Sequence, residues 1–302
     1  MNEEERLEGL LAQAWASRRA NFPPTIEFDY PKATGVVSTT GKACALDCAH
    51  CGGHYLEDML PIAEALRRAG GGGGGGRGDG EGQTVKSWLI SGGCDREGRV
   101  PFWPHLGAIE ALGQTGRLNF HVGLVGEEEA ALLGKLAATV SFDFVVDDET
   151  IHEVFGLDKT GDDYVRSYLA LRRHAKVLPH VLIGIKGGVI AGERRILDKL
   201  EELGLDGLVF IVFDPTPGTR YADRQPPDVA EAAAIIAEAR IRFSSIPISL
   251  GCMRPRGRYR SKLDQLAVRA GVNKIVQPTP GARRLAAELG LAVTRGDECC
   301  VL

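Results

Sequence analysis

The sequence lacks the features that direct a chain to a membrane, a secretory pathway or a nucleic acid. No hydrophobic run approaches the length of a membrane span. The first residues, Met1–Arg6, are acidic and polar, unlike the basic and apolar start of a signal peptide. The formal net charge of −4 gives no sign of nucleic-acid binding. We therefore expect a cytoplasmic protein in a reducing compartment, where clustered thiols are usually metal ligands.

A phosphate-binding loop is also missing, because no GxxxxGK[ST] motif occurs. The glycine-rich run Gly70–Gly82 is no substitute for it. Such a run has few side chains to pack, so little interaction energy offsets the conformational entropy lost when its backbone becomes ordered. We expect it to be a flexible insertion away from the chemistry.

Three cysteines in one short segment are the most informative feature that is present. Cys44, Cys48 and Cys51 form a CxxxCxxC run directly after an apolar stretch, Gly35–Thr39. Three thiolates can hold three irons of a cubane [4Fe-4S] cluster and leave the fourth iron open for another ligand. A structural zinc loop, a disulfide pair and chance are the alternatives. Zinc sites usually pair two CxxC-like halves, and no second CxxC or HxxxH half exists here.

Strand and helix signals alternate along nearly the whole chain of 302 residues, which is 44% hydrophobic and 25% charged. Short apolar strands that alternate with helices indicate a parallel sheet with crossover connections. Eight such units predict a complete (β/α)8 TIM-type barrel over 35–290, after an N-terminal helical extension at 1–34 and before a tail at 291–302. The expected strands are Gly35–Thr39, Lys86–Ile90, Leu118–Leu124, Phe142–Val146, Leu178–Ile185, Gly207–Phe213, Ile246–Leu250 and Asn273–Val276.

The expected helices lie between these strands and are amphipathic. In a barrel, residues just past the carboxyl ends of strands lie on the catalytic face. The cysteine triad follows the first strand and so falls there. The expected helices are Glu3–Ala20, Tyr55–Ala69, Trp103–Leu112, Glu127–Ala138, Tyr164–His174, Glu193–Leu203, Val229–Ile241, Arg260–Ala270 and Ala282–Leu289.

Further motifs follow the later strands. Gly92-Gly93 follows the second strand and is by itself an ordinary tight turn. Asp147-Asp148 follows the fourth strand and is equally consistent with a helix N-cap. Lys186 lies in a glycine-rich segment that could simply open the next helix, and Asp214–Thr219 contains a Pro-x-Pro-Gly-Thr turn.

The cysteine triad and these motifs together resemble radical S-adenosylmethionine (SAM) enzymes. The resemblance implies that Cys44, Cys48 and Cys51 hold the catalytic cluster, whose open iron binds SAM and cleaves it to a 5′-deoxyadenosyl radical. It also implies SAM contacts, made by Gly92, Gly93, Asp147, Asp148 and Lys186.

Four cysteines remain outside the triad, and four ligate a second [4Fe-4S] cluster completely. Cys94 and Cys252 follow strands on the catalytic face, while Cys299 and Cys300 lie on the tail, which would have to climb the barrel. The alternatives are that one of the adjacent pair is a spare thiol, or that all four cysteines are unrelated. Cys299–Leu302 also matches a prenylation box, but no polybasic segment accompanies it. In the cluster interpretation, Arg254 and Arg256 would lie close to the cluster, and Arg258 or Arg260 would meet an acidic partner.

The resemblance narrows to the biotin-synthase-related branch. The segments Ser91–Asp95, Gly251–Gly257 and Asp297–Cys300 resemble the octanoyl-acting component of the two-protein, archaeal-type lipoyl synthase. Residues 1–43 contain no cysteine, unlike single-chain lipoyl synthase. The resemblance implies a sulfurtransferase of lipoate biosynthesis that inserts the first sulfur on an octanoyl-lysyl carrier domain, either a lipoyl domain or a glycine-cleavage carrier protein.

The same resemblance implies a companion lipoyl synthase component and a ferredoxin or flavodoxin reductant, with no nucleic-acid or membrane partner. Two other classes stay open. One is a biotin-synthase-like or other cofactor-biosynthesis radical SAM enzyme whose second cluster transfers electrons or anchors substrate. The other is a non-catalytic iron-sulfur protein.

Overall fold

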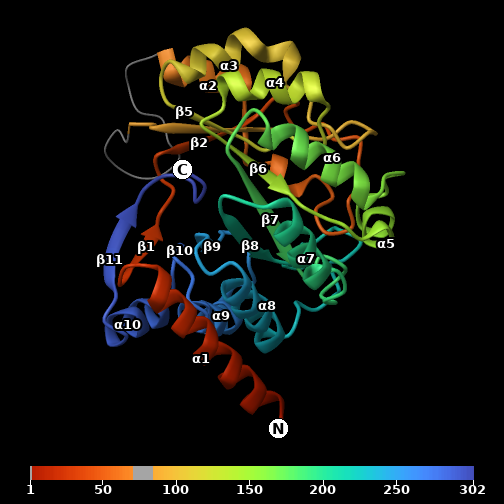
Figure 1. The fold of residues 1–302 in the computed structure, drawn as a ribbon. Helices are drawn as coiled ribbons and strands as arrows, with labels where there is room; N and C mark the ends of the chain where they lie inside the picture. Colours follow the sequence, from red (N-terminus) through yellow and green to blue (C-terminus); the bar gives the residue numbers. More distant parts are fainter. Residues whose placement is uncertain (1, 71–83) are drawn as a thin grey trace. The chain divides into compact units, whose positions relative to one another are not determined.

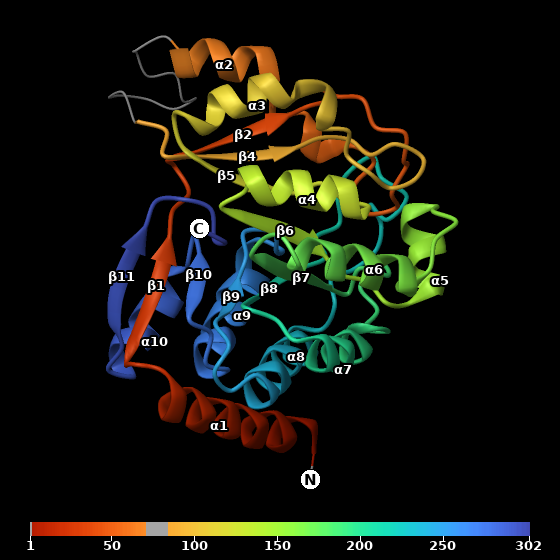
Figure 2. The same cartoon turned by 45° about the horizontal axis from the view of Figure 1, so that its top comes forward.

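The computed structural model describes residues 2–70 and 84–302. The expected insertion Gly70–Gly82 therefore lies, apart from Gly70, outside the described residues. The chain forms two compact units. Unit 1 holds the chain up to Tyr30 together with Pro179–Pro217 and Tyr221–Gly296, and unit 2 holds Pro31–Leu178, Gly218–Arg220 and Asp297–Leu302. Figures 1 and 2 show the chain coloured from red to blue.

Unit 2 is a parallel sheet with crossover helices. Its strands follow the order β6-β5-β4-β2-β3, and the register places Val36 of β2 beside Leu89 of β4, and Leu89 beside Asn119 of β5. Helices α2 and α3 pack against each other beside β2 and β4, as both views show (Figures 1 and 2). The strands are β2 Thr34–Ser38, β3 Leu60–Pro61, β4 Ser87–Ser91, β5 Arg117–Phe120 and β6 Thr139–Asp143.

The helices of unit 2 include one uncommon form. After β6 the chain makes a short α-helical turn and continues as a π-helix, a form that is rare and often occurs at functional sites. Its helices are α2 Ile62–Gly70, α3 Leu106–Gly113, α4 Glu127–Leu136, α5 Asp148–Thr150 and α6 Gly161–Arg172, with 3₁₀ turns at His54–Leu56 and Trp103–His105 and the π-helix at Ile151–Phe155.

Unit 1 repeats the same construction. Its strand order is β7-β8-β9-β10-β1-β11, and each strand pairs in parallel with its neighbours in this order. Strand β7 begins with Val177 and Leu178 in unit 2 and continues in unit 1. The strands are β1 Thr25–Asp29, β7 Val177–Ile183, β8 Leu208–Val212, β9 Ile248–Leu250, β10 Lys274–Val276 and β11 Ala292–Gly296.

The first helix of unit 1 packs against two later ones, α8 and α9 (Figure 2). Asn2 caps this helix because its side-chain oxygen accepts the Glu5 N–H at 2.8 Å and the Glu5 carboxylate accepts the Asn2 N–H. The helices are α1 Glu3–Asn21, α7 Glu193–Leu203, α8 Val229–Arg242, α9 Gly257–Arg269 and α10 Pro280–Glu288.

Alternation along the strands separates a helix-covered face from a polar one. In β1, Ile26 and Phe28 are buried and share a face with Ile275 of β10, whereas Glu27 and Lys274 share the opposite face. Burial of such large apolar side chains contributes about 1.5–3 kcal/mol each. At β1 and β10, the sheet of unit 1 thus presents polar side chains on the face opposite its hydrophobic layer.

The alternating α/β class and parallel strands are confirmed. All eight expected strands are present with ends that differ by a few residues, but β1, β3, β11 and the π-helix were not expected. Among the described residues, the strand order has two open ends and does not close into a ring of eight. The division at 1–34, 35–290 and 291–302 stays a prediction. No helix in the described ranges has the length and apolarity needed to cross a membrane.

Candidate functional site

The cysteine triad lies in the loop between β2 and the 3₁₀ turn at His54–Leu56, in unit 2. The loop has a tight turn at its end, because the N–H groups of Cys51 and Gly52 both donate to the Cys48 carbonyl, at 3.1 and 2.9 Å. Gly52 and Gly53 follow with φ of +51° and +77°, conformations that glycine adopts without strain. The sequence CxxxCxxCGG therefore specifies a compact loop that reverses directly after the third thiol.

The Gly-Gly pair after β4 packs directly against this loop. A Cβ on Gly93 would lie 2.0 Å from the Ala43 carbonyl oxygen and 2.7 Å from the Cα of Cys44. The Gly93 N–H donates to Thr40 Oγ1 at 2.7 Å, and the Ala45 N–H donates to the Cys94 carbonyl at 2.7 Å. The glycine is thus required for close approach of two loops, whatever else its backbone contacts.

Four thiols, not three, share this environment. Burial raises the pKa of Cys48, and the neighbouring Cys51, Cys94 and Cys44 raise it further. Burial, followed by Cys44 and two carboxylates, raises the pKa of Cys94 to about 12. Cys94, which was expected to serve a second cluster, therefore lies near the triad.

The donor set suits an iron-sulfur cluster, because soft thiolates are the ligands that such clusters use. Within residues 2–70 and 84–302, no three Cys, His, Asp or Glu side chains already form a metal-binding group. Thiols must lose their protons to bind iron, so the raised pKa values of Cys48 and Cys94 couple cluster binding to proton release.

The two carboxylates expected to contact SAM already cap helices. The Asp147 side chain accepts hydrogen bonds from the Thr150 N–H, at 3.0 Å, and from the Thr150 hydroxyl. Asp148 accepts the Gly161 N–H at 2.7 Å, at the start of α6. A carboxylate has about four lone-pair sites, so capping leaves acceptor capacity.

His121 and Asp143 form a polar pair that the sequence reading missed. His121 directly follows β5, and Asp143 is the last residue of β6. His121 Nε2 lies 3.2 Å from Asp143 Oδ2. Burial opposes the charged imidazole, but Asp143 and Cys299 outweigh it and raise the pKa of His121. Burial lowers the pKa of His50, beside the third cysteine, to about 4, and Asp143 opposes this. The signal in the sequence was a polar residue inside each of two expected apolar strands, Leu118–Leu124 and Phe142–Val146.

The tail contacts the opposite ends of the strands. Asp297 pairs with Lys86 at 2.6 Å and Glu298 with Arg117 at 2.5 Å, just before β4 and at the start of β5. The Cys299 N–H donates to Thr34 Oγ1, at the start of β2, at 2.8 Å. Cys94 follows the carboxyl end of β4, about five residues or roughly 15 Å further along. The expected climb of the tail to the catalytic face is not found.

Cys299 and Cys300 differ from the other thiols in their surroundings. The Asn119 side-chain N–H donates to Cys299 Sγ at 3.6 Å. Hydrogen bonding from Cys300 is the largest influence and lowers the pKa of Cys299 to about 7, against the effect of burial. The structure thus places Cys94 near the triad, whereas Cys299 and Cys300 lie near the amino ends of the strands of unit 2.

The remaining predicted residues belong to unit 1. Lys186 lies in the turn after β7, and Cys252 is exposed after β9. Arg254 is buried and pairs with Asp264 at 2.7 Å, and it also donates to the Gly251 and Val276 carbonyls. The Arg254 side chain is therefore committed to holding the loops after β9 and β10.

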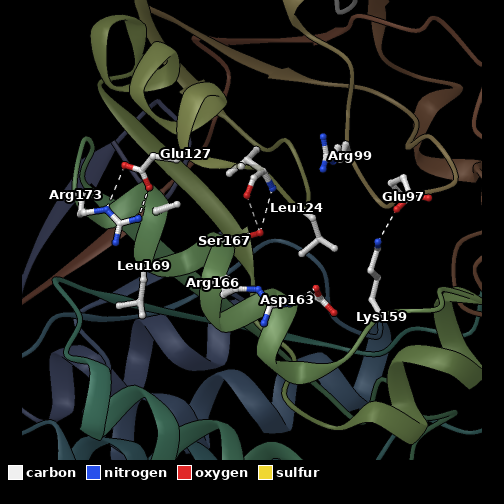
Figure 3. A pocket seen from close by; sticks show the side chains of 13 residues that line it. Glu97, Arg99, Leu124, Glu127, Lys159, Asp163, Arg166, Ser167, Leu169 and Arg173 are labelled. Carbon is white, nitrogen blue, oxygen red and sulfur yellow. Dashed lines mark hydrogen bonds and ion pairs between the residues drawn. The ribbon is translucent and has the colours of Figure 1, made fainter.

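A pocket of about 420 Å³ opens on unit 2 between the loop after Cys94, the start of α4 and α6 (Figure 3). Six of its seven charged side chains pair with one another: Lys159 with Glu97 at 2.5 Å, Arg166 with Asp163 at 2.5 Å, and Arg173 with Glu127. The seventh, Arg99, pairs with Glu129 outside the lining at 3.5 Å. The pocket therefore presents little net charge to a ligand.

Comparison with known proteins shows that other proteins share the fold of this chain. No family model and no curated protein sequence matches the chain. Solved structures do match. Methylornithine synthase (PylB) has a TM-score of 0.66 at 16% identity, covering 98% of this chain and 91% of that one. The FeFe-hydrogenase maturase HydG from Carboxydothermus hydrogenoformans has a TM-score of 0.68 at 16% identity, covering 97% and 73%. Streptococcus suis SuiB bound to S-adenosylmethionine has a TM-score of 0.54 at 13% identity, covering 82% and 58%.

Proposed function

We propose that this protein is a radical SAM enzyme. The observation that carries the proposal is the CxxxCxxC loop of Cys44, Cys48 and Cys51 at the carboxyl end of β2, with Gly93 packed against it. The fold shared with PylB, HydG and SAM-bound SuiB supports it.

Each set of residues has a distinct task. When bound, the [4Fe-4S] cluster supplies the electron that cleaves SAM. Cys44, Cys48 and Cys51 would hold the cluster. The backbone at Gly92 and Gly93 would approach SAM closely, because neither residue carries a side chain. Asp147 and Asp148 hold their helices and offer remaining lone pairs to the SAM ribose. Lys186, in the turn after β7, is proposed as a further SAM contact on the sequence resemblance alone.

We further propose, on the sequence resemblance, that the reaction inserts sulfur into an octanoyl chain on a carrier domain. A second [4Fe-4S] cluster would supply the sulfide. A companion component would add the second sulfur, and a ferredoxin or flavodoxin would supply electrons.

An alternative function is a radical SAM enzyme that does not transfer sulfur. The observation that favours it is the position of Cys299 at the amino end of β2, away from Cys94 at the carboxyl end of β4. A four-cysteine second cluster would require these thiols to meet.

The test is anaerobic incubation with SAM, dithionite and an octanoyl-lysyl peptide, with 5′-deoxyadenosine and peptide mass as readouts. We expect 5′-deoxyadenosine from the native protein and none from the Cys44→Ala/Cys48→Ala/Cys51→Ala variant. Iron that remains in this variant, about four atoms per chain, would support a second cluster. A sulfur-containing peptide product would support sulfur insertion, and SAM cleavage without it would favour the alternative.

A further inference from the structure

Three residues from a distant part of the sequence belong to the unit that contains the cysteine loop. Gly218–Arg220 belongs to unit 2, although the chain on both sides of it, up to Pro217 and from Tyr221, belongs to unit 1. Gly218 has a φ of +80°, which turns the chain there. The Thr219 methyl carbon lies 3.4 Å from the position that a Cβ on Gly52 would occupy. This short segment therefore contacts the cysteine loop directly.

Arg220 joins two separate backbone segments through one nitrogen. Its Nη2 donates to the Asp47 carbonyl at 3.1 Å, inside the CxxxCxxC run. It also approaches the Glu153 and Val154 carbonyls of the π-helix at 3.2 and 3.4 Å. All three acceptors are neutral carbonyl oxygens. Arg220 therefore acts here through the placement of its N–H groups, not through pairing with a carboxylate.

Two further contacts join the same segments without Arg220. The Ala49 N–H donates to the Val154 carbonyl at 2.7 Å. The rings of His50 and Phe155 meet edge to face, with centroids 5.8 Å apart and planes at 87°. The cysteine loop and the π-helix are thus held together at three points, and Arg220 supplies the one that comes from elsewhere in the sequence.

The π-helix continues directly from the turn that carries Asp147 and Asp148, the carboxylates expected to contact SAM. Whatever fixes the distance between the π-helix and the cysteine loop therefore fixes the distance between those carboxylates and the thiols. A displacement of about 1 Å in such an arrangement can cost roughly 10²-fold in rate.

We propose that Arg220 is a positioning residue that holds the cysteine loop against the π-helix and so aligns the cluster ligands with the SAM-binding residues. The inference rests on the proposed radical SAM function. Because Arg220 touches no thiol in the described contacts, its loss should affect SAM use more than iron loading.

The test compares Arg220→Ala, Arg220→Lys and the control Arg224→Ala. Arg224 is exposed four residues later and lies over the Tyr221 ring, 5.7 Å from its centroid. We expect iron content and melting temperature of Arg220→Ala to stay near those of the native protein. We expect kcat/KM for SAM cleavage to fall about 10²-fold, mainly through KM for SAM. Arg220→Lys should recover part of the loss, because its ammonium donates to carbonyls but lacks the planar fork.

Two readouts report on the contact itself. Amide hydrogen exchange of the unloaded protein should become faster at Ala49 and in 151–155 in Arg220→Ala, and should not change there in Arg224→Ala. Guanidinium at low, non-denaturing concentration should restore SAM cleavage to Arg220→Ala, whereas sodium chloride at equal ionic strength should not.

Four outcomes would overturn the inference: unchanged KM for SAM, iron loss in proportion to the loss of activity, unchanged exchange at Ala49, or no rescue by guanidinium. A native protein that binds no cluster and cleaves no SAM would instead refute the proposed function. In that case the hydrogen-exchange result would still decide whether Arg220 holds the two segments together.

Discussion

At the residue scale, single atoms decide whether the loops around the thiols can pack. Gly93 illustrates this, because the space for a Cβ is taken by the Ala43 carbonyl oxygen and by Cys44. The sequence pattern indicated the Gly-Gly pair, but we interpreted it as a place where the backbone contacts SAM. The neighbour that excludes a side chain comes from a loop about fifty positions away, so only the fold reveals it.

We therefore predict that Gly93→Ala destabilises the protein by about 1–3 kcal/mol, as overpacking does, and lowers iron content. Thermal unfolding and iron analysis measure both. The matched control is Gly107→Ala in α3, where a Cβ meets nothing within 4 Å. That change should be neutral or stabilise by up to about 1 kcal/mol, because alanine has the higher helix propensity. Equal melting temperatures for the two variants would contradict the packing argument.

A second residue-scale prediction concerns the buried ion pair of Arg254 and Asp264. Arg254→Met leaves the Asp264 charge buried without its partner and should cost about 3–5 kcal/mol. The double change Arg254→Met/Asp264→Leu should recover part of that loss, and Arg258→Met, at an exposed position, should cost little. Denaturant unfolding measures all three. A small effect of Arg254→Met on unfolding together with an altered cluster spectrum would instead favour the role near a cluster that the sequence suggested.

At the scale of elements, strand β1 ends in a buried carboxyl group, that of Asp29, and burial disfavours its charged form. Asp29 faces Gly296 of β11 closely, since a Cβ on Gly296 would lie 2.0 Å from Asp29 Oδ1. Burial raises the pKa of Asp29 to about 6, against the attraction of Lys274. A carboxyl whose pKa is raised on folding contributes stability below its unfolded pKa and loses it as the pH rises through the folded value.

We expect Asp29→Asn to be more stable than the native protein at pH 7.5 and to lose this advantage as the pH falls from about 6 to about 4. The difference should reach about 3 kcal/mol, from a shift of roughly two pKa units. Unfolding free energies measured across this pH range test it. Asp158→Asn, at an exposed position, is the control. A difference between Asp29→Asn and native protein that does not vary with pH would be inconsistent with the prediction.

The elements that the sequence did not reveal share a physical reason. Strand β1 is short, with only Ile26 and Phe28 as apolar positions, and β11 is an edge strand whose side chains are mostly exposed. Strands β4, β7 and β8 carry longer apolar runs, which is why they were predicted closely. The tail was misplaced because its position depends on pairs such as Lys86–Asp297, between residues over two hundred positions apart.

At the scale of the whole molecule, the glycine-rich run tests how the chain tolerates length changes. The run connects α2, which ends at Gly70, to β4, which begins at Ser87. We predict that replacing 71–82 with a short Gly-Ser turn leaves melting temperature and SAM cleavage near their native values. Each doubling of loop length changes closure entropy by only about 0.6 kcal/mol. Loss of SAM cleavage at an unchanged melting temperature would show that these residues take part in the chemistry.

The division of the chain between the units constrains the order in which the protein can form during synthesis. Unit 2 contains Asp297–Leu302, and unit 1 contains the chain up to Tyr30 together with residues as late as Gly296. Domains usually fold one after another as they leave the ribosome. Here the sheet of unit 2 waits for contacts such as Arg117–Glu298, which are made only after residue 298 has been translated. Nascent chains arrested before Asp297 should therefore expose the amino ends of β2, β4 and β5 to chaperones.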